Sequence, residues 1–327
     1  MTIRVAAPGL LTTVQDLGRV GHRRHGVAVG GAVDPLSLRV ANILVGNAPG
    51  AAALEITLLG PALVFDEPAV VAITGGDLGP LLDGRPVESW RPLTVPAGGV
   101  VSFSHPRRGC RAYLACLGGC AIPPVLGGRG TDLVAGIGGV AGRPLVTGDV
   151  LAGHGPAAAV AAAGARLTAA PARWSVAAEL RPAFTGTIRV MPGDEAGWFT
   201  PAAIAAWREG TFTVGTDSDR MGCRLAGPRL DLVAPREMLS ECVVAGTVQV
   251  PPSGRPIVLL AGHATTGGYP RIAQVAAVDL PELAQAAPGT RLRFLEIDPA
   301  ESRRLLLARE RSLAILARGL ALAGRRP

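Results

Sequence analysis

The chain has 327 residues, 48% of them hydrophobic and 4% aromatic, and a formal net charge of +7. This length is enough for two medium-sized domains, and the apolar share supplies a core that needs no disulfides. The basic residues are dispersed arginines without aromatic stacking platforms. We therefore expect no nucleic-acid partner, and instead an attraction for carboxylates, phosphates or an acidic protein partner.

Lysine is absent from the whole sequence. The chain has no lysine for covalent biotin, a Schiff base or a P-loop, so biotin or ATP chemistry requires another polypeptide or non-covalent binding. We see no signal peptide and no apolar stretch long enough to span a membrane, which predicts a cytoplasmic protein without a membrane partner. The five cysteines and five histidines lack metal-ligand spacing, so we expect no metal site.

The 44 glycines and 28 prolines favour short strands joined by tight turns, and hence a mainly β fold with a few helices. In the first half, the apolar runs Ala69 to Thr74 and Val100 to Phe103 predict buried strands. Residues 35–45 predict one helix, with Asp34 as its N-cap and Pro35 as its first residue.

Residues 156–181 are rich in alanine, glycine and proline. We interpret them as a linker between an N-terminal domain (residues 1–155) and a C-terminal domain (residues 182–298). Residues 299–327 predict an amphipathic C-terminal helix that docks on the protein through its leucines. Strands of the second domain are predicted at Ile188 to Met191, Val243 to Val250 and Ile257 to Leu260.

The two halves resemble each other in motifs that occur in the same order. Asp16-x-x-Arg19-x-Gly21-x-Arg23 recurs as Asp217-x-x-Arg220-x-Gly222-x-Arg224, Gly60-Pro61 recurs as Gly227-Pro228, and Pro96-x-Gly98 before Phe103 recurs as Pro288-Gly289 before Phe294. Such an ordered set predicts a duplicated β-barrel.

Several long motifs, taken together, resemble those of one protein family over residues 1–297. They are TTVQDLGR (12–19), GGAVD (30–34), ANILVGN (41–47), LEITLLGP (54–61), PPVLGGRGTD (123–132), SDRMGCRLAGP (218–228), the run 237–249 and TTGGYPRIA (265–273). The family is that of the biotin-dependent carboxyltransferases and the 5-oxoprolinase C subunits, also called allophanate hydrolase subunit 2 or KipA-like proteins.

This resemblance implies two tandem cyclophilin-like β-barrel domains and a role in a multi-protein complex. The implied complex is an ATP-dependent 5-oxoprolinase that opens 5-oxoproline to glutamate. In it, this chain acts with a KipI-like B-type subunit and a third subunit of the A type, and ATP is used by the complex without any covalently bound cofactor. Because no complete nucleophile–base set is visible, we expect the chain to be inactive alone.

Two alternatives stay open within the resemblance. One is a carboxyltransferase component that moves CO2 from carboxybiotin, supplied in trans, to urea or a related amide. The other is a non-catalytic, KipA-like regulator of a KipI-like kinase inhibitor. Relatives commonly have serines where Gly128 and Gly130 stand, and Asp and Gln where Gly262 and Ala264 stand. The loss of these polar side chains favours the regulator.

Candidate substrate-binding residues follow from the chemistry of carboxylates. Arg220 and Arg224 are four residues apart and are candidates for a guanidinium clamp, with Asp219 orienting one of them; a structural ion pair inside a barrel is the competing interpretation. The run Thr265, Thr266, Gly267 and Gly268 is a tight turn. Its N–H and hydroxyl groups either bind an amide or carboxylate or simply connect two strands.

The catalytic candidates are Tyr269, Glu237 and Glu241. Tyr269 follows the glycine turn and suits a lid or a proton partner. Glu237 and Glu241 are interpreted either as paired carboxylates that supply a general base or as solvated loop charges. In the first half, Arg129 and Asp132 lie in a glycine-rich loop that either binds an anion or is a turn stabilised by Asp132.

Overall fold

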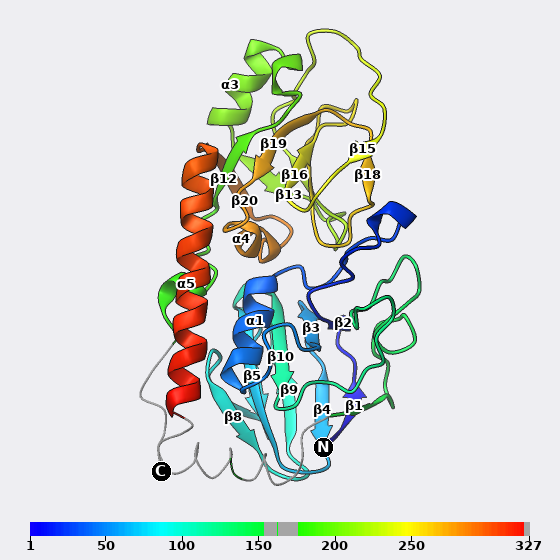
Figure 1. Ribbon diagram of the computed structural model, residues 1–327, viewed down its shortest axis with the longest axis vertical. Coiled ribbons are helices and arrows are strands. Elements are labelled where there is room, and N and C mark those ends of the chain that lie inside the picture. Colours follow the sequence, from blue (N-terminus) through cyan, green and yellow to red (C-terminus); the bar gives the residue numbers. More distant parts are fainter. Residues whose placement is uncertain (154–161, 163–175, 324–327) are drawn as a thin grey trace. The chain divides into compact units, whose positions relative to one another are not determined.

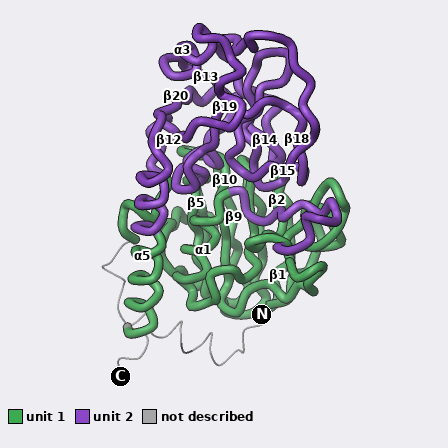
Figure 2. The backbone as a smooth tube through the Cα atoms, turned by 45° about the horizontal axis from the view of Figure 1, so that its top comes forward, with its two compact units in different colours: residues 1–19, 34–182, 310–327 green, residues 20–33, 183–309 purple. Residues whose placement is uncertain are grey.

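The structure, a computed structural model, describes residues 1–153, 162 and 176–323. The chain divides into two compact units, coloured separately in Figure 2. Unit 1 comprises residues 1–19, 34–182 and 310–327, and unit 2 comprises residues 20–33 and 183–309. The units therefore do not follow the linear domain order expected from the sequence, since residues 20–33 belong to unit 2. Most of the expected linker, residues 156–181, lies outside the described residues.

Unit 1 contains two antiparallel sheets. The six-stranded sheet has the order β11 (Val150–Ala152), β1 (Thr2–Ala7), β4 (Ala62–Phe65), β9 (Val100–Phe103), β6 (Pro80–Leu82) and β7 (Arg85–Pro86). The five-stranded sheet has the order β2 (Leu11–Gln15), β3 (Ala53–Thr57), β10 (Arg108–Cys116), β5 (Ala69–Asp77) and β8 (Pro92–Val95). The predicted strands at 69–74 and 100–103 are confirmed as β5 and β9.

Helix α1 (Pro35–Leu44) explains why strands of the five-stranded sheet are buried along nearly their whole length. The helix packs on β5 and β10, beside which it lies in Figure 1. The other face of the sheet supplies Leu54, Ile73 and Leu114 to the core of unit 1. A strand covered on both faces has no solvent side to alternate with, so it becomes a continuous apolar run.

Asp34 begins helix α1 as the sequence predicts. Its Oδ1 accepts the backbone N–H of Ser37 at 2.9 Å and its Oδ2 accepts the Ser37 hydroxyl at 2.6 Å. The backbone N–H of Asp34 donates to the hydroxyl of Tyr113 at 2.8 Å, and that hydroxyl donates to Glu55 at 2.7 Å. These bonds join the start of the helix to buried side chains of β3 and β10, so the cap is also a tertiary anchor.

Unit 2 is built on a closed barrel. Around the ring, the strands are β12 (Thr187–Pro192), β19 (Arg271–Val275), β16 (Thr247–Gln249), β17 (Ile257–Leu259), β14 (Gly222–Ala226), β13 (Phe212–Val214) and β20 (Arg291–Glu296). All neighbours are antiparallel except β12 and β20, which pair in parallel. A separate two-stranded sheet joins β15 (Glu241–Cys242) and β18 (Thr266–Gly267).

These observations confirm a mainly β fold with few helices, and a barrel in the second half. In the first half, where a second barrel was expected, the described strands form the two sheets of unit 1. The predicted strand from Val243 to Val250 is shorter than expected. Only Thr247–Gln249 is a strand, because residues 243–246 turn at Gly246, whose φ is +87°.

The barrel core is filled by aromatic and branched side chains. Trp207 of helix α3 (Pro201–Glu209) stacks on Phe294 with ring centroids 4.1 Å apart, and Phe212 meets Phe294 edge-on at 5.7 Å. Val33, from the early segment 20–33, belongs to the same buried cluster. Helix α3 begins with Thr200, whose hydroxyl accepts the N–H of Ala203 at 3.1 Å.

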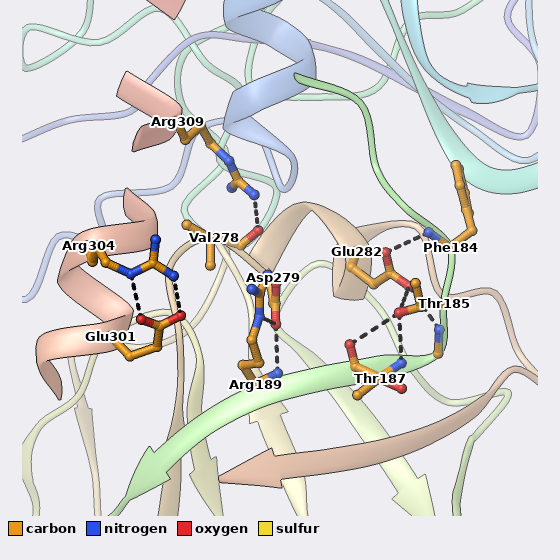
Figure 3. A network of polar contacts seen from close by, with 11 residues as sticks. Phe184, Thr185, Thr187, Arg189, Val278, Asp279, Glu282, Glu301, Arg304 and Arg309 are labelled. Carbon is orange, nitrogen blue, oxygen red and sulfur yellow. Dashed lines mark hydrogen bonds and ion pairs between the residues drawn. The ribbon is translucent and has the colours of Figure 1, made fainter. Parts of the chain in front are cut away.

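Helix α4 (Leu280–Ala284) is tied to the start of the barrel by the polar network in Figure 3. Asp279 receives the Arg189 guanidinium at 2.5 and 2.9 Å, and Glu282 receives the backbone N–H groups of Phe184 at 2.6 Å and Gly186 at 2.9 Å. The hydrogen bond from Arg189 to Asp279 holds the pKa of Arg189 above its ordinary value.

Helix α5 (Pro299–Ala323) is the predicted C-terminal helix. Its residues up to Arg309 belong to unit 2, and those from Glu310 belong to unit 1. In unit 1, Glu310 receives both terminal nitrogens of Arg39 at 2.6 and 2.7 Å, and Leu313 is buried. Within the described part of the chain, no helix is long and apolar enough to cross a membrane.

Candidate functional site

Two of the candidate segments of unit 2 meet in the small sheet of β15 and β18. Glu241 pairs with Gly267, and Cys242 pairs with Thr266. Thr266 and Gly267 therefore lie in a strand, where the sequence predicted a tight turn. The pairing places Gly268 next to Ser240, since a Cβ added to Gly268 would lie 3.2 Å from the Ser240 hydroxyl. The structure therefore brings together the 237–241 and 265–269 segments that the sequence singled out separately.

The buried side chain of Gln249 on β16 contacts the segment 267–269. Its side-chain amide donates to the backbone carbonyl of Tyr269 at 3.4 Å, and a Cβ on Gly267 would lie only 2.3 Å from the same amide nitrogen. Strand β18 thus requires glycine at 267 because the buried amide occupies that space. Tyr269 is 44% exposed.

Arg23 joins this site from the segment 20–33. Its guanidinium donates to the backbone carbonyls of Val243 and Thr265, the latter at 3.2 Å. Sequence reasoning did not propose Arg23 as a site residue. Its place at the end of the repeated Asp-x-x-Arg-x-Gly-x-Arg motif was a usable signal, because that motif also contributed the candidates Arg220 and Arg224.

His263 lies beside Arg23 and is buried. Its Nδ1 is 2.6 Å from the carbonyl oxygen of Ala264, so this nitrogen carries the hydrogen and Nε2 is the acceptor. Burial lowers the pKa of His263, the Ala264 carbonyl opposes this effect, and the Arg23 charge adds to it. The imidazole is therefore neutral at pH 7.

Arg220 and Arg224 face different surroundings. Arg220 is buried and donates to the carbonyl of Gly31 at 2.6 Å, and burial lowers its pKa to about 10. Arg224 is exposed on β14 and lies 3.5 Å from Asp217. The carboxylate of Asp219 accepts the backbone N–H groups of Met221 at 2.8 Å and Gly222 at 3.1 Å. The expected clamp is not formed in this geometry. The Arg220 guanidinium is buried, whereas the Arg224 side chain is exposed to solvent.

Glu237 and Glu241 also have different surroundings. Glu241 lies 3.0 Å from Arg271, while Glu237 lies in an exposed stretch before β15. Arg271 binds Glu195 more closely, at 2.6 Å, and has Asp194 at 3.2 Å. The Arg271 hydrogen bond lowers the pKa of Glu195. Glu241 is thus an ion-paired carboxylate in this structure, and its role as a base paired with Glu237 stays a prediction.

In unit 1, Arg129 and Asp132 stabilise turns. The backbone N–H of Arg129 donates to Asp16 at 2.5 Å, and the Arg129 Nε donates to the carbonyl of Ile122 at 2.9 Å. Asp132 accepts the backbone N–H groups of Val134 and Ala135, each at 3.0 Å. The geometry favours the competing interpretation of Asp132 as a turn stabiliser, because its Oδ1 receives both of these bonds.

The repeated motif has a physical counterpart in the two units. Arg19 in unit 1 and Arg220 in unit 2 are both buried, and each donates from Nη2 to a glycine carbonyl, that of Gly130 and Gly31 respectively. Each buried arginine therefore holds a glycine-rich segment of its own unit. Among the described residues, no group of three His, Cys, Asp or Glu side chains is placed to hold a metal ion.

Comparisons with known proteins agree over most of the chain. The family model described as carboxyltransferase domain, subdomain A and B, matches residues 25–296. The chain is 38% identical to the C subunit of 5-oxoprolinase from Haemophilus influenzae over 293 residues, which is 90% of each protein. It is 38% identical to the corresponding C subunit from Escherichia coli over 302 residues, 92% of this chain and 93% of that protein.

Among solved structures, the Kluyveromyces lactis urea carboxylase matches with a TM-score of 0.87 and 28% identity. The match covers 96% of this chain and 29% of that chain, so this chain spans less than a third of the urea carboxylase. The family model covers well over half of the chain, and the alignment with the Haemophilus influenzae relative extends over nine-tenths of each of the two proteins. The chain therefore belongs to the carboxyltransferase domain family of subdomains A and B, and is related over most of its length to the C subunits of 5-oxoprolinase.

Proposed function

We propose that this chain is the C-type subunit of an ATP-dependent 5-oxoprolinase that opens 5-oxoproline to glutamate. The observation that carries the proposal is the 38% identity to two bacterial 5-oxoprolinase C subunits, each matched over at least 90% of its length. An unrelated activity at this level of full-length similarity would require the site to have been rebuilt on the same fold.

The division of labour that we propose leaves ATP to the partner subunits. The chain has no lysine for a phosphate-binding loop, which supports this assignment. In the reaction, ATP phosphorylates the lactam oxygen and is released as ADP. Water adds to the activated carbon, and the ring C–N bond breaks as the nitrogen takes up a proton. A second water hydrolyses the resulting γ-glutamyl phosphate to glutamate and phosphate. We propose a KipI-like B-type subunit and an A-type subunit as partners, no activity of the chain alone, and a cytoplasmic complex.

The surface that we propose for substrate contact is the two-stranded sheet of β15 and β18. Tyr269 is partly exposed there, and Ser240 lies next to Gly268. The Arg23 guanidinium donates to the Thr265 carbonyl and adds a positive charge. A cation and polar groups at an open turn suit an amide that carries a carboxylate. Tyr269→Phe keeps the ring and removes the hydroxyl, so it tests the phenol alone.

The first experiment measures glutamate release from 5-oxoproline and ATP by the chain together with its genomic-neighbour subunits, leaving out each protein in turn. We expect release only from the full set, and at least a tenfold lower rate with Tyr269→Phe, in keeping with the usual contribution of a positioned proton donor. Release that continues without this chain contradicts the proposal.

Carboxyl transfer is the second candidate, and the match to the Kluyveromyces lactis urea carboxylase is the observation that favours it. It requires biotin carboxylase and carrier proteins in trans, because this chain has no lysine to carry biotin. Formation of carboxylated urea from urea and carboxybiotin, with no glutamate from 5-oxoproline, would replace the first proposal by this one.

A further inference from the structure

Arg19 is a buried cation with few partners. Its exposed fraction is 0%, its Nη2 donates to the carbonyl of Gly130, and its Nε and Nη1 have no hydrogen-bond partner. In the part of the chain that the structure describes, no carboxylate lies within ion-pair distance of it. Both oxygens of the neighbouring Asp16 accept backbone N–H groups instead, those of Gly18 and Arg129. A guanidinium stays charged at any physiological pH, so burying it without a counter-ion is costly unless a ligand supplies one.

Gln15 presents a buried acceptor at the same place. Its side-chain nitrogen donates to the Thr13 hydroxyl at 3.1 Å and to the carbonyl of Thr131 at 3.0 Å. The contact with the Thr131 carbonyl fixes the orientation of the amide, because an oxygen there would face another oxygen. The remaining Oε1 is buried and has no partner. Arg19 and Gln15 thus bind the neighbouring carbonyls of Gly130 and Thr131. Arg19 has two donor nitrogens without a partner, and Gln15 has one acceptor oxygen without a partner.

The glycine-rich loop of residues 127–139 closes over both side chains. A Cβ on Gly130 would lie 2.7 Å from Gln15 Oε1, one on Gly128 would lie 2.7 Å from Arg19 Cγ, and one on Gly138 would lie 2.1 Å from Arg19 Nη2. In this chain the glycines at these positions let the loop backbone approach both side chains closely. Besides the isolated bridges of Val125 with Gly128 and Asp132 with Ile137, the loop is bound to β2 through Thr131, whose N–H and hydroxyl both donate to the Val14 carbonyl, at 2.8 and 3.0 Å. A ligand reaches the buried groups only when the loop opens and these bonds break.

We propose that Arg19 and Gln15 form a second binding site, in unit 1 and in addition to the contact surface of β15 and β18 in unit 2. It is covered by the 127–139 loop and takes a small carboxylate that also carries an N–H donor. The guanidinium binds the carboxylate, and Gln15 Oε1 accepts the N–H. 5-Oxoproline carries both groups on one small ring, so naming it as the ligand rests on the proposed function. The site itself rests on the unused donors and acceptor.

The test compares three ligands by isothermal titration calorimetry with the full chain and with the co-purified complex. They are 5-oxoproline, 2-pyrrolidinone, which keeps the lactam N–H and lacks the carboxylate, and cyclopentanecarboxylate, which keeps the carboxylate and lacks the N–H. We expect 5-oxoproline to bind at least tenfold more tightly than either of the others, since each analogue leaves one buried group without a partner. This comparison uses the wild-type protein and does not depend on the folding of a variant.

Arg19→Met removes the charge and keeps a long side chain. We expect at least tenfold weaker binding of 5-oxoproline, together with unchanged or higher resistance to urea, because the variant no longer buries a cation without a counter-ion. A purely structural role for Arg19 predicts lower resistance instead. Arg4→Met is the control, since Arg4 forms an exposed ion pair with Asp66 in the same unit, and it should bind like wild type.

The outcomes separate this inference from the proposed function. Equal binding by Arg19→Met, or binding of none of the three ligands by chain or complex, overturns the site, while glutamate release by the full set of subunits keeps the proposed function. Arg19-dependent binding without any glutamate release supports the site and contradicts the oxoprolinase proposal.

Discussion

Arg271 gathers three acidic side chains around one guanidinium on β19. Its closest partner is Glu195, whose two oxygens receive Nε at 2.7 Å and Nη2 at 2.6 Å. The Glu195 side chain is 8% exposed and that of Arg271 is 15% exposed, so little water screens the pair. A pair of this kind contributes mainly because removing one member leaves the other buried and uncompensated.

Replacing Arg271 with glutamine should therefore lower the free energy of unfolding by about 2–3 kcal/mol. Urea denaturation at pH 7 measures the change. Arg208→Gln is the matched control in the same unit, because Arg208 and Glu296 are both largely exposed, and it should change the free energy by less than about 0.5 kcal/mol. Equal effects of the two substitutions would show that burial does not matter for the Arg271 pair.

The same pair predicts a pH dependence. The pKa of Glu195 is lowered from the ordinary value of 4.5, first by the Arg271 hydrogen bond. Between the folded and unfolded pKa values the unfolded state binds more protons, so the stabilisation is complete above about pH 4.5 and is lost as the pH falls through the folded pKa. The difference in urea midpoint between wild type and Arg271→Gln should shrink from pH 7 to pH 3. A constant difference over that range contradicts this origin.

The two glycines at the end of β18, Gly267 and Gly268, should differ in their tolerance of a methyl group. Gly267→Ala places a Cβ 2.3 Å from the buried Gln249 amide, whereas Gly268→Ala meets only the Ser240 hydroxyl at 3.2 Å. We expect Gly267→Ala to displace Gln249 from the Tyr269 carbonyl and to destabilise the protein by about 1–3 kcal/mol. Gly268→Ala should cost less than about 1 kcal/mol.

Thermal unfolding of both variants checks this order, and glutamate release by the complex shows whether the loss at Gly267 extends to function. If both variants lose the same stability, the Gln249 contact does not determine the conformation of residues 267–269.

At the scale of elements, helix α5 shows how an amphipathic pattern becomes packing. Leu313 is 2% exposed and Ile315, two residues further along the same helix, is 71% exposed. The two positions point to different sides because successive residues are rotated by about 100°. The leucine face predicted from the sequence is therefore buried at Leu313, while the intervening Ile315 remains in solvent.

Leu313→Ala and Ile315→Ala form a matched pair. We expect about 2–3 kcal/mol of destabilisation from Leu313→Ala, from lost apolar burial and the cavity left behind. Ile315→Ala should stay within about 0.5 kcal/mol of wild type. Denaturation midpoints in guanidinium chloride measure both, and a large effect at Ile315 would indicate that this face of α5 is covered in solution.

At the scale of the whole molecule, residues 20–33 belong to unit 2 although 149 residues of intervening chain, from 34 to 182, belong to unit 1. The segment contributes Val33 to the barrel core, Arg23 to the carbonyls of Val243 and Thr265, and the Gly31 carbonyl to Arg220. A barrel cut from the chain by linear boundaries lacks all three contributions.

A fragment of residues 183–309 should consequently be less stable than unit 2 in the full chain. We expect faster hydrogen exchange at the amides of Val248 and Val258, both buried in the barrel, and partial recovery when the segment 20–33 is joined to the fragment by a flexible linker. Exchange as slow as in the full chain would mean that the segment is dispensable.

The sequence alone determined those features that depend on neighbouring residues. The Asp34–Pro35 start of α1, the strands β5, β9, β12 and β17, and the C-terminal helix follow from caps, apolar runs and periodicity, which act within a few residues. The ordered motifs likewise determined the family. Even the repeated Asp-x-x-Arg motif was informative, since Arg19 and Arg220 hold equivalent bonds to glycine carbonyls.

Only the tertiary structure decided which partners the charged candidates have. Arg224 lies near Asp217, and Arg220 donates to the Gly31 carbonyl. Glu241 forms an ion pair with Arg271, and the Gln249 amide occupies the space next to Gly267. Each of these contacts depends on long-range strand pairing and on the return of residues 20–33 to the barrel. A side chain finds its partner through the fold, at sequence separations over which local propensity and periodicity carry no information.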